Sequence, residues 1–208
     1  MKVLITGADG FIGKNLQLHL AEREDVTVVC FTRNHSVAQL PDLLQGVDFV
    51  FHLAGVNRPQ DPLEFAKGNA ELTLTLCQLV VDVAQATGIK VPIIFTSSTQ
   101  AGDDNAYGKS KLAAEQALQG VTLRHGIPIH IFRLPNVFGK WCKPNYNSVV
   151  ATFCHNLARG LPIQIHAPGA VLRLVYIDDV VSTFIHVLEK PESGFSFERV
   201  EPEYSLTL

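Results

Sequence analysis

Residues 3–13 read VLITGADGFIG and decide the fold. The stretch opens with a continuous apolar run that includes β-branched residues, which is typical of a strand buried on both faces. Gly7, Gly10 and Gly13 follow at intervals of three, and apolar residues then recur at helical spacing from residue 12 to residue 20. The sequence therefore predicts a strand, a glycine-rich turn and an amphipathic helix in that order.

The three glycines have the spacing of a phosphate-binding turn. Gly7 permits a tight turn, Gly10 lets the backbone approach a pyrophosphate, and Gly13 allows the helix to pack closely on the strand. The first helical residues, Phe11 and Ile12, then present backbone N–H groups to the negative charge. Such glycines also occur by chance in plain turns, but the strand-turn-helix context favours a dinucleotide site.

The rest of the chain continues the alternation of short apolar runs and longer helical patterns. A long helical stretch begins at Asp61-Pro62 and ends at Gly88. Further strands are predicted at residues 26–29, 49–51, 93–95 and 129–132. This order predicts an α/β fold of the Rossmann type, with a doubly wound parallel sheet.

The spacing also predicts a trimmed sheet edge and the organisation of the domain. Residues 34–47 are too few for both a full helix and an extra strand. We expect one domain over residues 1–208, with a dinucleotide-binding part to about residue 139 and a small C-terminal substrate-binding portion over about 140–208. That portion contains a helix at 148–159.

The last residues have a pattern of their own. Residues 204–208 read as the cap and first turn of a helix that does not continue, so we expect the chain to be a truncated part of a longer protein.

Composition restricts the class of partner. The chain has 208 residues, is 47% hydrophobic and carries a net charge of −3, with no stripe of Lys or Arg of the kind that nucleic-acid or anionic-membrane binding requires. It has no apolar stretch of the ~20 residues that a membrane helix needs. The four cysteines form no CxxC pair, and the eight histidines form no HExxH or HxH pattern. We therefore expect a cytoplasmic protein with a small-molecule partner and no metal.

The end of the second strand indicates which dinucleotide is bound. A site that prefers NAD usually presents a carboxylate there to the ribose hydroxyls, whereas this chain has Phe31-Thr32-Arg33. We therefore predict NADP(H), with Arg33 on the 2′-phosphate. The alternative is that Arg33 is a solvated surface charge.

A second group of residues indicates catalysis. Ser98 lies just past the fourth predicted strand, and Tyr107 and Lys111 are four positions apart, so that a helix places them on one face. We expect the ammonium of Lys111 to lower the pKa of Tyr107, which then exchanges protons near neutral pH. Ser97 and Thr99 are neighbours that could take the role of Ser98.

These three features together resemble the extended short-chain dehydrogenase/reductase family, which acts mostly on sugar nucleotides. Residues 52–55 resemble the family's strand-end segment beside the adenine ribose, Asn69 resembles its helical asparagine, and residues 133–139 resemble its segment from nicotinamide to substrate. The resemblance implies further cofactor contacts from Leu53, Ala54, Gly55, Asn69 and Leu134.

Two longer segments, HLAGVNRP at residues 52–59 and FGKWCKPNYNS at 138–148, resemble a narrower group of the family that makes nucleotide sugars for capsular polysaccharide and O-antigen. This resemblance implies NADPH-dependent reduction of the 4-keto group of a UDP-linked 2-acetamido-2,6-dideoxy-L-hexos-4-ulose, on the route to UDP-N-acetyl-L-fucosamine. Enzymes of that group also carry a C-terminal metal-binding cupin domain, to which nothing in this sequence corresponds.

The same resemblance implies a UDP-sugar substrate and a homodimer. Phosphate recognition needs fixed donors and cations, although the lysines could equally be solvated surface charges. The residues expected to bind substrate are Asn57, Arg58, Asn136, Lys140 and Lys143. The helices near residues 62–87 and 107–118 correspond to the pair through which related enzymes form a four-helix dimer interface.

Two other functions are compatible with the fold. A 4-epimerase or a 4,6-dehydratase holds NAD, but Arg33 disfavours NAD, and Thr99-Gln100 follows Ser98 where a dehydratase of the family has an Asp-Glu pair. A non-catalytic dinucleotide-binding protein is the alternative of another class. Such proteins commonly lose the pair formed here by Tyr107 and Lys111.

Overall fold

The computed structural model describes residues 1–61, 63–146, 148–165 and 167–207. Over these residues the central sheet has six parallel strands in the order β2-β1-β3-β4-β5-β8. The strands are β1 (Lys2–Thr6), β2 (Thr27–Phe31), β3 (Phe49–His52), β4 (Ile93–Ser98), β5 (Ile129–Leu134) and β8 (Phe195–Glu198). The predicted Rossmann-type sheet is confirmed, with β8 as an additional edge strand.

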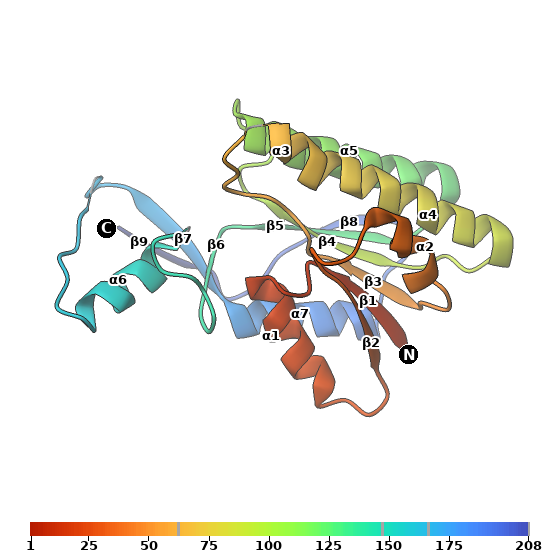
Figure 1. The fold of residues 1–208 in the computed structure, drawn as a ribbon, viewed down its shortest axis with the longest axis horizontal. Coiled ribbons are helices and arrows are strands. Elements are labelled where there is room, and N and C mark those ends of the chain that lie inside the picture. Colours follow the sequence, from red (N-terminus) through yellow and green to blue (C-terminus); the bar gives the residue numbers. More distant parts are fainter. Residues whose placement is uncertain (62, 147, 166, 208) are drawn as a thin grey trace.

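Helices cover both faces of this sheet, as Figure 1 shows. On one face lie α1 (Phe11–Ala21) and α7 (Ile177–Glu189), and on the other lie α2 (Leu40–Leu43), α4 (Leu72–Thr87) and α5 (Ala106–His125). Apolar side chains pack in two separate clusters, one on each face of the sheet. Because both faces are covered, the strands read as continuous apolar runs. Among the described residues, none of the helices combines the length and apolar character needed to cross a bilayer.

The trimmed sheet edge is also confirmed. Between β2 and β3 the chain forms only the 3₁₀ turn η1 (Val37–Gln39) and the short α2, and β2 is the edge of the described sheet. The chain then crosses back to the other side of β1, so that the strand order reverses between β1 and β3. Open α/β sheets bind ligands at such a reversal, beyond the carboxyl ends of the strands.

The predicted long helix before Gly88 has three parts. A short α3 (Leu63–Phe65) is followed by a π-helical segment, η2 (Ala66–Glu71), and then by α4, which ends where Gly88 adopts φ +76°. Pro62, predicted in the first turn, lies outside the described residues. Single π-helical turns are frequent at functional sites, and Asn69 lies within this one.

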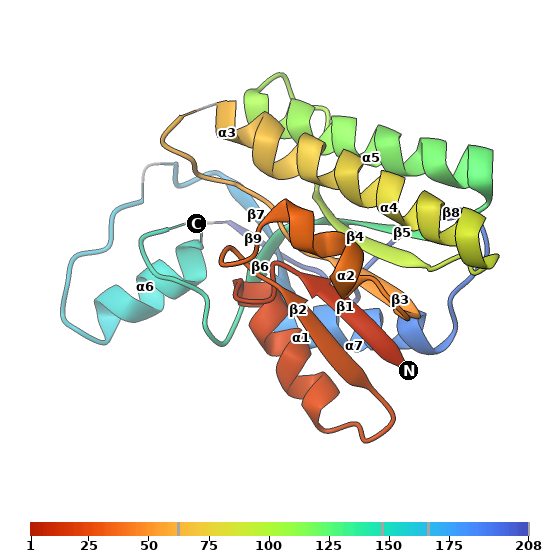
Figure 2. The ribbon, with the colours of Figure 1, turned by 45° about the vertical axis from the view of Figure 1, so that its right-hand side comes forward.

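Only part of the predicted C-terminal portion forms a separate small layer, at the left of Figure 1 and seen from another side in Figure 2. This layer comprises β6 (Asn136–Phe138), β7 (Val171–Tyr176), β9 (Tyr204–Thr207) and α6 (Val149–Leu157), whereas α7 and β8 belong to the central sheet and the helices that cover it. The predicted helix at 148–159 is confirmed, with Ser148 as its N-cap.

The prediction of a helical turn at 204–208 is wrong over the described part, because Tyr204–Thr207 pairs antiparallel with β7. The backbone hydrogen bonds available along β7 outweigh the weak local signal for a turn. Leu208 lies outside the described residues.

Candidate active site

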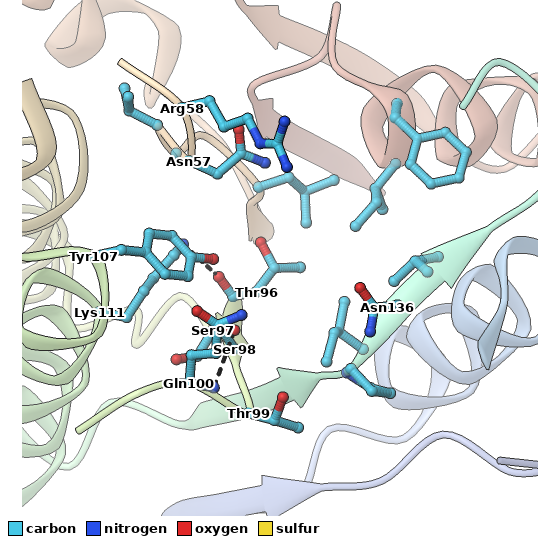
Figure 3. A pocket seen from close by; sticks show the side chains of 18 of the residues that line it. Asn57, Arg58, Thr96, Ser97, Ser98, Thr99, Gln100, Tyr107, Lys111 and Asn136 are labelled. Carbon is cyan, nitrogen blue, oxygen red and sulfur yellow. Dashed lines mark hydrogen bonds between the residues drawn. The ribbon is translucent and has the colours of Figure 1, made fainter. Parts of the chain in front are cut away.

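A cavity of about 460 Å³ opens at the carboxyl ends of the central strands, beside the reversal of strand order. In Figure 3, Tyr107 and Lys111 project into it from one side and Asn136 lies on the opposite side. The predicted site residues that line it are Phe11, Ile12, Leu53, Gly55, Asn57, Arg58, Ser98, Tyr107, Lys111, Leu134 and Asn136. Segments that are far apart in the sequence are thus brought to one crevice.

The glycine turn beside this cavity has no room for side chains. Gly7 adopts φ +70°, and a Cβ atom there would lie 2.7 Å from the backbone nitrogen of Ala54. A Cβ atom on Gly13 would lie 2.5 Å from the carbonyl oxygen of Gly7. Gly10 is the N-cap of α1, and the described structure gives this helix start neither a side-chain cap nor an acidic residue in its first turn. This cradle and its N–H groups fit the pyrophosphate of a dinucleotide.

The segment after β3 is held from behind by Asn69. The backbone N–H of Val56 donates to Asn69 Oδ1 at 2.8 Å, and Asn69 Nδ2 donates to the carbonyl of Val56 at 2.9 Å and to Ser110 Oγ at 2.9 Å. Asn69 is buried and lies behind Gly55, which faces the cavity. The structure therefore places this predicted cofactor contact as a support for the cavity wall.

His52 is a core residue. Its Nδ1 lies 2.7 Å from Thr6 Oγ1 and its Nε2 lies 2.8 Å from Thr73 Oγ1, so both ring nitrogens have partners. Burial, together with the charge of Lys111, lowers the pKa of His52 to about 3. The imidazole is therefore neutral at physiological pH and supports the end of β3.

Lys111 reaches the cavity from α5 through a buried environment. Its Nζ donates to the carbonyl of Thr96 at 2.9 Å and lies 4.9 Å from the centroid of the Phe95 ring. Burial lowers the pKa of Lys111 to about 8, and the charge of Glu115 opposes this shift. Lys111 is thus mostly protonated at neutral pH, but its pKa is only about one unit above neutral.

The environment of Tyr107 differs from the expectation. Burial raises the pKa of Tyr107, and a hydrogen bond with Ser98 partly opposes this rise. Lys111 was expected to lower this pKa, but its ammonium is hydrogen-bonded to the carbonyl of Thr96. Tyr107 is therefore a protonated phenol at neutral pH, held beside Ser98.

Eight predicted site residues lie outside the lining of this cavity as described: Gly7, Gly10, Gly13 and Asn69 are placed above, and the other four are Arg33, Lys140, Lys143 and Ala54. Arg33 is exposed two residues beyond Phe31, whose carbonyl accepts from the N–H of Gly7 at 2.9 Å, so it lies near the glycine turn. Lys140 and Lys143 are exposed on the loop after β6, and Lys140 Nζ lies 4.8 Å from the centroid of the Trp141 ring. The fourth, Ala54, borders Gly7 through its backbone.

Several lining residues were not identified from the sequence. Thr96 and Gln100 lie at or just after the end of β4, so position at a strand end was a usable signal for them. Cys142 reaches the cavity only because the loop after β6 folds back. The full set is Val56, Thr96, Ser97, Thr99, Gln100, Pro135, Val137 and Cys142, of which Ser97 and Thr99 were considered only as substitutes for Ser98.

A second cavity of about 520 Å³ lies between the segment after β3 and the C-terminal portion. Arg58 lines both cavities, and its guanidinium carbon lies 6.0 Å from the centroid of the Tyr146 ring. The hydroxyl of Tyr146 donates to Asn57 Oδ1 at 2.8 Å. The two cavities therefore adjoin at Arg58 and form an extended site; Asn147 lies outside the described residues.

Comparison with known proteins matches residues 3–201 to the NAD dependent epimerase/dehydratase family. Over all 208 residues the chain is 55% identical to a UDP-2-acetamido-2,6-beta-L-arabino-hexul-4-ose reductase from Pseudomonas aeruginosa, of which it covers 55%. The crystal structure of the capsular polysaccharide assembling protein CapF from Staphylococcus aureus matches the whole chain with a TM-score of 0.82 and 40% identity, over 56% of its own length. The chain thus spans about half the length of these relatives.

A UDP-glucose 4-epimerase from Thermotoga maritima matches the whole chain with a TM-score of 0.86 but only 22% identity. At that identity the match concerns the fold alone.

Proposed function

The chain belongs to the NAD dependent epimerase/dehydratase family, and from this premise we propose that it reduces the 4-keto group of a UDP-linked 2-acetamido-2,6-dideoxy-L-hexos-4-ulose with NADPH. The observation that carries the proposal is the 55% identity, over the full chain, to a reductase whose name specifies a UDP-linked hexulose. The role would be on the route to UDP-N-acetyl-L-fucosamine for capsular polysaccharide or O-antigen.

The cradle of Gly7, Gly10 and Gly13 would hold the pyrophosphate of the cofactor, with Phe11 and Ile12 at the start of α1. Leu53, Gly55 and Leu134 would line the site along the dinucleotide. NADPH, when bound, supplies the hydride for the reduction.

Two side chains of the protein would bind and protonate the oxygen on C4. The Ser98 hydroxyl donates a hydrogen bond to the substrate carbonyl, and the Tyr107 phenol donates the proton that converts it to a hydroxyl. Burial supports this role, because a raised pKa keeps Tyr107 protonated before reaction. Lys111, whose ammonium is held by the carbonyl of Thr96 and does not lower the pKa of Tyr107, would bind the cofactor ribose.

The two cavities suit the two halves of a UDP-sugar. The sugar would occupy the cavity beside Tyr107, and the uridine would extend into the one between Arg58 and α6. Arg58 borders both cavities and would face the diphosphate, with Asn57 beside it. Asn136, on the opposite wall, and the exposed Lys140 and Lys143 would add donors and positive charge.

The lining near Ser98 favours reduction over elimination of water. Thr99 and Gln100 face the cavity directly after Ser98 and provide a hydroxyl and an amide there. A 4,6-dehydratase needs an acid at this place. This supports the reductase over the dehydratase.

The proposal is tested by following NADPH absorbance with the UDP-linked 2-acetamido-2,6-dideoxy-L-hexos-4-ulose as substrate. We expect one NADPH oxidised for each 4-keto group that becomes a hydroxyl. Product formation without net oxidation of NADPH would instead support the epimerase or dehydratase, and cofactor binding without product would support a non-catalytic protein.

Arg33 is proposed to bind the 2′-phosphate of NADPH, because it is exposed beyond β2 and near the glycine turn. A charge-assisted hydrogen bond contributes about 1.5–3 kcal/mol, so Arg33→Ala should weaken NADPH binding about 10–100-fold and leave NADH binding nearly unchanged. Fluorescence titration measures both affinities. The exposed Arg159, replaced by Ala, is the control; equal losses for the two dinucleotides in Arg33→Ala would contradict the assignment.

We also propose a homodimer through α4 and α5, which pack side by side in Figures 1 and 2. Leu74 on α4 is 55% exposed and Leu123 on α5 is 79% exposed, so these helices present apolar surface to solvent. Gel filtration with light scattering is expected to give twice the mass of the chain. A monomer at micromolar concentration would overturn this proposal.

The cysteines support a cytoplasmic location, where thiols stay reduced. In the described structure, Cys30, Cys77, Cys142 and Cys154 are all free thiols. NADPH and UDP-sugars would be available to the proposed reaction in that compartment.

A further inference from the structure

Glu115 is a buried carboxylate that the proposed reaction does not use. It is 3% exposed and lies on α5, one turn after Lys111 and two turns after Tyr107, so the three residues share one face of the helix. A buried carboxylate is costly unless it is paired and hydrogen-bonded. The partners of Glu115 therefore affect how Tyr107 and Lys111 are held.

Those partners belong to β4 and β5. Ser97 Oγ donates to Glu115 Oε1 in a short hydrogen bond, and Arg133 donates through Nε to Oε1 at 2.9 Å and through Nη2 to Oε2 at 2.6 Å. Ser97 and Arg133 are opposite each other in the register of the two strands. One carboxylate thus joins α5 to the carboxyl ends of two central strands.

The contacts of Glu115 connect the elements that carry the site residues. Ser97 directly precedes Ser98, which is hydrogen-bonded to Tyr107, while Lys111 reaches back from α5 to the carbonyl of Thr96. Glu115 therefore holds the strand that carries Ser98 against the helix that carries Tyr107 and Lys111. Arg133 is held in turn by the Phe197 ring of β8, whose centroid is 4.7 Å from its guanidinium carbon.

Glu115 is also the negative charge that acts on Lys111. Among the described groups around Lys111, Tyr107 is a neutral phenol, His52 on β3 is neutral because burial lowers its pKa to about 3, and Arg133 on β5 is paired with Glu115. Burial lowers the pKa of Lys111 to about 8, and Glu115 acts in the opposite direction.

We propose that Glu115 is a positioning residue for this reductase: it fixes the end of β4 against α5 and supplies the buried negative charge that Lys111 faces. The inference rests on the proposed function only for its effect on turnover. Its effect on Lys111 exists in the protein without cofactor or substrate.

The first test uses Glu115→Gln, which keeps the shape of the side chain and removes its charge. We expect kcat to fall about tenfold or more, and the alkaline limb of the kcat profile to move to lower pH by about one unit, because an adjacent charge shifts a pKa by this order. In the cofactor-free protein, the pH dependence of Lys111 acetylation, followed by mass spectrometry, should give the same lower pKa. Glu189→Gln is the matched control, because it removes a carboxylate that pairs with Arg23 far from the site.

The second test separates position from charge. Ser97→Ala removes the hydroxyl and leaves Glu115 paired with Arg133, so we expect a lower kcat with the Lys111 pKa unchanged. Glu115→Asp keeps the negative charge on a shorter side chain, so the pKa of Lys111 should lie between those of the wild type and Glu115→Gln. Thermal unfolding is measured for each variant. If Glu115→Gln does not fold, Ser97→Ala carries the test of position, and Glu115→Met, which also removes the charge, carries the test of charge.

An unchanged pKa of Lys111 in Glu115→Gln, or in Glu115→Met if the former does not fold, would overturn the electrostatic role. Full kcat in Ser97→Ala would overturn the positioning role. If the wild type oxidises no NADPH with the UDP-sugar, the proposed function fails, while the acetylation measurement still decides the role of Glu115 toward Lys111.

Discussion

Replacing Tyr107 by Phe is expected to lower kcat for the proposed reduction by about 10²–10⁴-fold, the usual contribution of a positioned general acid. The ring of Tyr107 lies against Phe65, with centroids 5.7 Å apart, and the Phe variant keeps this packing. The loss therefore comes from the missing proton donor. Steady-state turnover and NADPH titration on the same preparation measure it, and the dissociation constant for NADPH should remain nearly unchanged.

Tyr204→Phe is the matched control for this prediction, because Tyr204 is exposed on β9. It should turn over at the wild-type rate. Turnover by Tyr107→Phe within a few-fold of wild type would exclude Tyr107 as the proton donor and would favour Ser98 as the donor instead.

Gly7→Ala is expected to weaken NADPH binding by more than about 100-fold, which corresponds to roughly 2.7 kcal/mol. The added Cβ would lie 2.7 Å from the nitrogen and 2.8 Å from the Cα of Ala54, and φ at this position is +70°. Relief of these contacts requires β1 and the segment after β3 to move apart, and this opens the cradle for the pyrophosphate. Isothermal titration with NADPH and thermal unfolding measure the two effects.

Gly88→Ala separates crowding from backbone strain. Gly88 has a similar φ of +76°, but among the described atoms none lies within 4 Å of a Cβ built there. It should therefore lose stability by about 1 kcal/mol, the cost of a left-handed conformation, and bind NADPH normally. If Gly7→Ala also binds NADPH normally, the glycine turn is not the dinucleotide cradle.

Much of the fold could be predicted from the sequence because the patterns that predict it involve residues close together in the chain. The strands, the glycine turn and the helical spacing of Tyr107 and Lys111 each depend on residues within a few positions of one another. The short connection over residues 34–47 predicted the sheet edge for the same reason. Local patterns also mislead, as at Tyr204–Thr207, where pairing with partners 30 to 36 positions earlier in the chain decided the conformation.

By itself, the sequence determined the Rossmann-type sheet, the glycine turn and the Ser98, Tyr107 and Lys111 group, because strand ends and helix faces follow from periodicity. Only the tertiary structure decided which carboxylate faces Lys111 and how Arg58 joins two cavities. The contacts that decide these points join residues far apart in the chain: Ser97 and Glu115 are 18 positions apart, and Tyr146 and Asn57 are 89 apart. The direction of the Tyr107 pKa belongs to the same group, since burial is a property of the packed molecule and helical spacing does not encode it.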